Sequence, residues 1–158
     1  MPTPEREILF VCTGNTCRSP MAERLMKHLC RSVDGWTFSS AGVFAAEDSP
    51  ASAGAIEALG EKGLDLSDHR ARHLTPEMLR EAAWVIPMTA DHRRLVLEQA
   101  PERAQRVRTL HSFGDANPAK DVMDPVGGSL DTYRVTRDEI ESALTDLILA
   151  VIQPTSQP

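Results

Sequence analysis

The sequence predicts a single α/β domain built on a doubly wound sheet of four parallel strands, with helices on both faces. Short apolar runs alternate with helix-start signals along the chain, an order typical of parallel sheets. The 158 residues are enough for one domain with a sizeable core. We expect the domain to cover residues 1–152, followed by a disordered tail at 153–158.

The first strand, loop and helix start form the most informative stretch. Residues 8–12 predict a strand buried on both faces, because the apolar run is uninterrupted. Gly14 and Asn15 tolerate the unusual backbone angles that a tight loop needs. Ser19-Pro20 combines a hydroxyl cap with a proline and predicts a helix start, with the helix continuing through 21–31.

The later elements follow the same alternation. Further strands are expected at Trp36–Ser40, Trp84–Met88 and Arg106–Leu110. Helices are expected to open at Ser49-Pro50 and Thr75-Pro76 and to cover Asp91–Gln99 and Asp131–Ile152. Such sheets bind ligands outside the carboxyl ends of their strands. We therefore expect Cys12 and the loop around Asp124 to meet there.

The loop that follows the first strand has the composition of an anion site. Backbone N–H groups in a loop wrapped over a helix start point into one concavity, and the helix dipole adds positive potential. Arg18 supplies a planar fork that can hold two phosphate oxygens. The phosphate-binding residues are thus expected to be Thr13, Gly14, Asn15, Thr16, Cys17 and Arg18.

The same features that bind an anion favour the thiolate form of Cys12, which would attack phosphorus as a nucleophile. Ser19 is placed to donate a further hydrogen bond to it. The leaving group then needs a proton from a general acid. Asp124, which precedes Pro125 on an irregular loop, is the candidate, and Asp121 is a rival that the sequence leaves open.

Composition narrows the function classes. With 17 basic and 23 acidic residues, the net charge of -6 disfavours a general nucleic-acid or anionic-membrane binder. No apolar run reaches the roughly 20 residues of a membrane span, and the N-terminus lacks a signal-peptide pattern. We expect a cytoplasmic monomer. Three cysteines argue against a disulfide framework, and no zinc spacing occurs, so we expect no metal and no cofactor.

Cys12 and Arg18 are separated by five residues, and this spacing resembles the signature of protein tyrosine phosphatases. Its place directly after the first strand resembles the low-molecular-weight class of that family. The resemblance covers the chain from Ile8 to the last helix and implies flavodoxin-like topology, with Asp124 as the general acid and phosphorylated proteins as substrates. It also implies that Ser40 and His69 hydrogen-bond to Asn15.

Three segments look like those of the bacterial protein-arginine phosphatases within this family: residues 12–19, 40–45 and 124–129. That subgroup carries a threonine at the place of Thr16, where tyrosine phosphatases commonly have a bulky aliphatic residue, and its hydroxyl can serve a polar guanidinium. Val126 departs from the subgroup, which usually has an aromatic residue there. Phe44 is then the expected remaining wall of the site, and Thr16, Phe44 and Val126 are the expected specificity residues.

The leading hypothesis is therefore a cysteine-dependent phosphatase acting on phosphoarginine, with phosphotyrosine as the alternative substrate. A thiol-dependent arsenate reductase shares the fold and loop, but beyond Cys30, expected to be a small core residue, the chain has no cysteine for a relay. A phospho-ligand binding module would not need an acid. Cys17 could form a reversible disulfide with Cys12 that protects the nucleophile, or simply pack under the loop.

Overall fold

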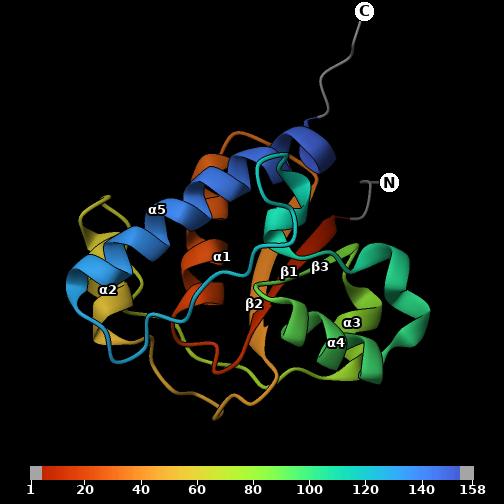
Figure 1. Cartoon of the computed structure of the whole chain (residues 1–158), viewed down its shortest axis with the longest axis horizontal. Coiled ribbons are helices and arrows are strands. Elements are labelled where there is room, and N and C mark those ends of the chain that lie inside the picture. Colours follow the sequence, from red (N-terminus) through yellow and green to blue (C-terminus); the bar gives the residue numbers. More distant parts are fainter. Residues whose placement is uncertain (1–4, 154–158) are drawn as a thin grey trace, which may run out of the picture.

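The computed structural model describes residues 5–153 and shows a parallel sheet with helices on both faces (Figure 1). The central strand β1 (Arg6–Cys12) lies between β2 (Trp36–Gly42) and β3 (Trp84–Pro87). In this register Cys12 pairs with Gly42 at the carboxyl edge. The predicted α/β class and the placing of Cys12 at the end of a strand are confirmed.

The predicted fourth strand, Arg106–Leu110, is wrong. Within residues 5–153 the sheet has three strands, and Val107 contributes only an isolated parallel bridge to Val85. The 3-10 helix η1 (Pro101–Arg106) ends just before this bridge, and η2 (Leu110–Phe113) follows it. The carbonyl of Thr109 accepts the Ser112 N–H at 3.0 Å. Because this turn takes the backbone away from the sheet, the ladder ends after one bridge.

Two layers of helices enclose the sheet (Figure 1). One side holds α1 (Arg18–Leu29), α2 (Ala53–Gly60) and α5 (Leu130–Leu147), which ends in the π turn η3 (Ile148–Ile152). The other side holds α3 (Pro76–Glu81) and α4 (Ala90–Gln99). In the part of the chain that the structure describes, no helix is long and apolar enough to cross a membrane.

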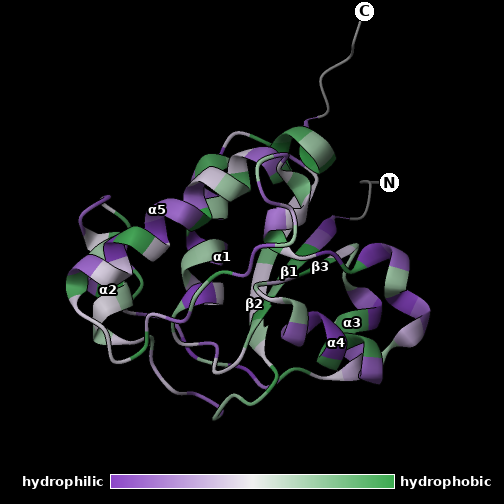
Figure 2. Ribbon diagram, in the orientation of Figure 1, coloured by the Kyte–Doolittle hydropathy of each residue, from purple (hydrophilic) through white to green (hydrophobic). Residues whose placement is uncertain are grey.

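The alternation of β1 divides the core in two. Ile8, Phe10 and Cys12 belong to the apolar cluster beneath α1, α2 and α5, whereas Leu9 and Val11 belong to the cluster beneath α3 and α4. Successive side chains of a strand point to opposite faces, so a strand buried on both sides has no polar position. Figure 2 shows this apolar centre with hydrophilic residues on the outer faces of the helices.

The observed helix starts show which of the predicted capping residues were correct. Thr75 caps α3 as predicted, accepting the Met78 N–H at 3.3 Å. The helix predicted from Ser49-Pro50 begins three residues later, with Ser52 as its cap. Ser19 is not a cap, because α1 begins at Arg18 and the Ser19 hydroxyl is used elsewhere. Of the expected tail at 153–158, residues 154–158 lie outside the described part of the chain.

Candidate active site

The loop of residues 12–18 is held in shape by Asn15. This residue is fully buried and has a left-handed φ of 57°, whereas Gly14 does not adopt a positive φ. The Arg72 backbone N–H donates to Asn15 Oδ1 at 2.9 Å, and His69 Nε2 donates to the Asn15 carbonyl at 2.8 Å. These partners offset the cost of the strained backbone. His69 thus lies where the family resemblance placed it.

Within the described part of the chain Ser40 makes no hydrogen bond to Asn15, contrary to expectation. Its hydroxyl donates to Glu23 Oε1 at 2.6 Å, because β2 lies beside α1 at this point. The amide N–H of Arg72 holds the Asn15 side chain instead. Gly42 serves the loop in another way: a Cβ there would lie 2.5 Å from the carbonyl oxygen of Thr13. Only glycine lets β2 approach the loop this closely.

In the loop of residues 12–18, backbone carbonyl groups bond to the surrounding protein, whereas, among the described residues, the backbone N–H groups of 13–17 do not. Carbonyl oxygens of Cys12, Thr13 and Thr16 accept N–H groups from outside the loop, at 2.9–3.0 Å. Among the described residues, no backbone N–H group of 13–17 donates to a protein acceptor. Successive N–H groups without protein partners at a helix start form an anion-binding concavity. The geometry therefore supports the predicted phosphate cradle.

Cys12 lies at the base of this cradle and is 2 % exposed. Its Sγ is 2.9 Å from the Ser19 hydroxyl, which in turn accepts the Asn15 Nδ2–H at 2.8 Å. Asn15 therefore holds the Ser19 hydroxyl where it can donate a hydrogen bond to the Cys12 sulfur. Ser19, the expected helix cap, supports the candidate nucleophile.

Arg18 closes the side of the cradle and is 5 % exposed. Its Nη1 donates to the Val122 carbonyl at 3.0 Å, while Nη2 lies 3.4 Å from Thr13 Oγ1 and 3.6 Å from Asp124 Oδ2. Its Nε is buried without a hydrogen-bond partner in the described residues. Buried donors normally have an acceptor. The guanidinium is thus fixed by the protein and retains a donor for an anion.

These groups share one cavity of about 170 Å³. It is lined by Cys12, Thr13, Gly14, Thr16, Cys17, Arg18, Asp124 and Val126. Asp124 has a side chain that is 49 % exposed, as a group exchanging protons with water requires. Its rival Asp121 does not line this cavity and accepts the Ala90 N–H at the start of α4, at 2.8 Å. Asp124 therefore remains the candidate acid, while Asp121 accepts a hydrogen bond from the start of α4.

The expected apolar walls are only partly present. Val126 lines the cavity, but Phe44 does not. Phe44 is 69 % exposed, and its contact with the loop is a backbone hydrogen bond to the Thr13 carbonyl. The role of Phe44 as a wall for a bound substrate therefore stays a prediction, with its ring exposed outside the lining of the cavity.

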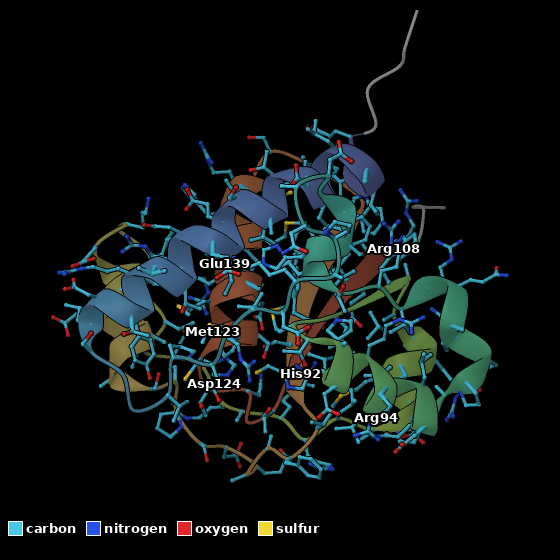
Figure 3. All side chains as sticks on the ribbon, in the orientation of Figure 1. His92, Arg94, Arg108, Met123, Asp124 and Glu139 are labelled. Atoms are coloured by element: carbon cyan, nitrogen blue, oxygen red, sulfur yellow. The ribbon has the colours of Figure 1, made fainter. Side chains whose placement is uncertain are left out.

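His92 was missed by sequence reasoning, which gave it no role. It is 4 % exposed, and its Nε2 lies 2.8 Å from Thr13 Oγ1. Figure 3 shows His92 coming from α4 on the sheet side of the site, with Asp124 on the loop beside it. Burial, together with the charge of Arg18, lowers the pKa of His92 from 6.5 to about 4. No local pattern distinguishes it from the other histidines, since its contact spans 79 positions.

The remaining cysteines have different surroundings. Cys17 lines the cavity and lies beneath the loop, with its Sγ 3.2 Å from Ser52 Oγ and 3.6 Å from the Tyr133 hydroxyl. Both Cys12 and Cys17 are free thiols here. Cys30 lines a different cavity beside Trp36, where burial raises the pKa of its thiol. Cys30 is therefore not placed to relay a disulfide from Cys12.

Comparison with known proteins agrees with this geometry. Residues 7–157 match the family model for low molecular weight phosphotyrosine protein phosphatase. The chain is 43 % identical over 140 residues to a protein-arginine-phosphatase of Geobacillus stearothermophilus, covering 89 % of this chain and 92 % of that one. It is 36 % identical over 136 residues to the low molecular weight protein-tyrosine-phosphatase Etp of Escherichia coli, covering 86 % and 88 %.

A solved structure gives the same result. A mutant of YwlE arginine phosphatase with a phosphorylated active-site serine has a TM-score of 0.85 and 40 % identity, covering 93 % of this chain and 97 % of that one. Fold and site thus define a cysteine-based phosphatase. The chain belongs to the low-molecular-weight phosphotyrosine protein phosphatase family.

Proposed function

We propose that this phosphatase removes phosphoryl groups from arginine side chains of proteins through a phosphocysteine intermediate. The observation that carries the proposal is the single cavity shared by Cys12, Arg18, Thr16 and Asp124. In this cavity Cys12 serves as the nucleophile, Arg18 binds the phosphoryl group and Asp124 serves as the acid. Thr16 adds a polar residue to the lining. The arginine-phosphatase relative at 43 % identity, and the phosphorylated serine in the YwlE structure, support the substrate and the intermediate respectively.

The first chemical step forms an S–P bond and breaks the P–N bond of phosphoarginine. The Cys12 thiolate attacks phosphorus while the loop N–H groups and Arg18 hold the phosphoryl oxygens, where negative charge is concentrated. Protonated Asp124 gives its proton to the leaving guanidine nitrogen. Its place on the cavity wall, 3.6 Å from Arg18, supports this role.

The second step hydrolyses the phosphocysteine. Asp124, now a carboxylate, takes a proton from a water that attacks phosphorus. The S–P bond breaks, inorganic phosphate leaves and the Cys12 thiolate is restored. The Ser19 hydroxyl at 2.9 Å can stabilise the departing thiolate. Cys12→Ser should therefore release no phosphate from a phosphopeptide, whereas a binding module would behave alike with and without this change.

Substrate choice depends on Thr16, whose side chain lines the cavity. A hydroxyl there can hydrogen-bond the reacting guanidinium or a water serving it. An isoleucine would leave that polar group unpaired, at a cost of about 1–3 kcal/mol. Thr16→Ile should thus lower phosphoarginine turnover by roughly ten- to a hundredfold, since about 1.4 kcal/mol is tenfold in rate.

The decisive measurement is kcat/KM for phosphoarginine and phosphotyrosine peptides in parallel. Phosphotyrosine turnover should hold or rise in Thr16→Ile, because the change adds apolar surface for a phenyl ring. Thr145→Ile, on the exposed face of α5, is the matched control and should leave both values unchanged. A wild-type preference for phosphotyrosine, with a ratio that Thr16→Ile does not alter, would refute arginine specificity.

Phosphotyrosine is the second candidate substrate, and one observation favours it. Val126 lines the cavity and is 62 % exposed, so an apolar surface is available to a substrate ring. The same parallel assay decides between the two substrates. Arsenite production with added thiols would instead revive the reductase hypothesis, although Cys30 lines a separate cavity.

A further inference from the structure

A second cavity, of about 280 Å³, lies beside the catalytic loop and shares no lining residue with the catalytic cavity. It lies between α1, the end of β2 and residues 68–72. We call it the α1–β2 groove. Its charged lining residues are Glu23, Arg24, Lys27, Asp68, Arg70 and Arg72.

The two carboxylates of the groove are already paired. Glu23 lies 2.7 Å from the ammonium of Lys27, and Asp68 lies 3.0 Å from Nη2 of Arg24. Each pair leaves no net charge. The two carboxylates therefore neutralise two of the four cations. The net positive charge of the groove comes from the two arginines that remain.

Arg70 and Arg72 have no carboxylate partner among residues 5–153. Arg70 Nη1 donates to the His69 carbonyl at 2.9 Å, and Arg72 Nε donates to the Ser40 carbonyl at 3.1 Å. Their remaining guanidinium donors have no protein acceptor among the described residues. On a chain with a net charge of -6, two such arginines in one groove indicate a site for an anion.

One further polar atom of the groove lacks a partner. Arg24 Nε is buried and has no hydrogen-bond partner in the described part of the chain. Buried polar atoms of native proteins are nearly always hydrogen-bonded, to the protein or to something bound to it. Its presence beside Arg70 and Arg72 is independent support for a ligand that accepts hydrogen bonds.

The chemistry of this lining is specific. Guanidinium groups bind phosphoryl oxygens through paired N–H bonds. We propose that the α1–β2 groove is a second phosphoryl-binding site, distinct from the catalytic cradle. The phosphoryl group could come from free inorganic phosphate, the product of the family reaction, or from a second phosphorylated side chain of a substrate protein.

The groove is connected to the catalytic loop through Asn15. Arg72 lines the groove and also donates its backbone N–H to Asn15 Oδ1. His69, in the same segment, donates to the Asn15 carbonyl. An anion that draws on the Arg72 side chain therefore acts on the segment that holds Asn15 in its left-handed conformation. Occupancy of the groove is coupled to the shape of the cradle.

The test is a titration of the whole chain with inorganic phosphate, followed by backbone amide NMR. Two sets of amides should shift with different midpoints: those of 13–17 in the cradle, and those of 39 and 70–72 in the groove. Arg70→Gln should weaken groove binding by roughly tenfold, the usual loss for a charge-assisted contact, while the cradle amides of 13–17 still titrate. Arg80→Gln, the same charge change on α3, should alter neither.

A second variant separates direct binding from transmitted shifts. Arg18→Gln should weaken phosphate binding in the cradle while the groove amides still titrate, and the Asn15 side-chain amide should move with them. The proposal would be overturned if the groove amides no longer shift with phosphate in Arg18→Gln. It would also be overturned if they titrate with an unchanged midpoint in Arg70→Gln. The readout is binding and not turnover, so its failure would leave the proposed function untouched.

The source of the phosphoryl group is distinguished with Cys12→Ser and a doubly phosphorylated peptide. A groove midpoint lower for the peptide than for inorganic phosphate indicates a second phosphorylated side chain, because one peptide then bridges both sites. Equal midpoints indicate free phosphate. Both results presuppose the groove site, which the arginine variants test.

Discussion

Acid should destabilise this protein through His92, and His92→Gln should remove that effect. The imidazole is buried against Thr13, and its pKa is lowered from 6.5 to about 4 by burial first and by the charge of Arg18 second. Asp91, Asp121 and Asp124 oppose this shift but do not cancel it. Lowering the pH therefore forces a proton onto a group that the native state keeps neutral.

The sign and size follow from the two pKa values. Between pH 6.5 and about pH 4 the unfolded chain binds this proton more readily than the native state does. The contribution of neutral His92 to the free energy of unfolding is therefore fully present above pH 6.5 and is lost as the pH falls toward 4. Between about pH 7.5 and about pH 5, this residue alone should cost about 2 kcal/mol of unfolding free energy.

The assay is urea unfolding of wild type and His92→Gln at both pH values. The other titrating groups are common to the two proteins, so the difference in their pH dependence isolates His92. Glutamine keeps a polar group near Thr13 without the protonation. The variant should lose about 2 kcal/mol less than wild type over this interval, and His28→Gln, at an exposed position on α1, should behave as wild type. Equal losses in wild type and His92→Gln would refute the reasoning.

Two further predictions concern the catalytic cavity. Asp124→Asn should slow formation of the phosphocysteine by roughly 10²–10⁴-fold for poor leaving groups and least for a nitrophenolate, whereas Asp121→Asn should show no dependence on the leaving group; equal losses across leaving groups would exclude Asp124 as the acid. Gly42→Ala should lower kcat/KM by roughly ten- to a hundredfold, because its Cβ would lie 2.5 Å from the Thr13 carbonyl and displace the loop. Gly60→Ala, with open space around its Cβ, should leave kcat/KM unchanged, and an active Gly42→Ala enzyme would show that the loop can yield.

Local signals located the centre of the site from the sequence alone. An uninterrupted apolar strand, a loop with Asn15 and a following helix must place Cys12 at the carboxyl edge of a sheet, because these features act over a few residues. The spacing to Arg18 is also local, and a helix start brings that side chain back over the loop. The Asp124-Pro125 pair required the family resemblance, since its distance from Cys12 along the chain carries no geometry.

Tertiary packing decided what the sequence left open or indicated wrongly. The apolar stretch after Arg106 has a strand pattern, but the turn at Thr109 diverts its backbone, so only Val107 meets the sheet. Ser40 bonds to Glu23 because β2 lies beside α1, and His92 reaches Thr13 because α4 begins at the same edge as β1 ends. Contacts between residues distant in the chain depend on how elements pack, which no local pattern records.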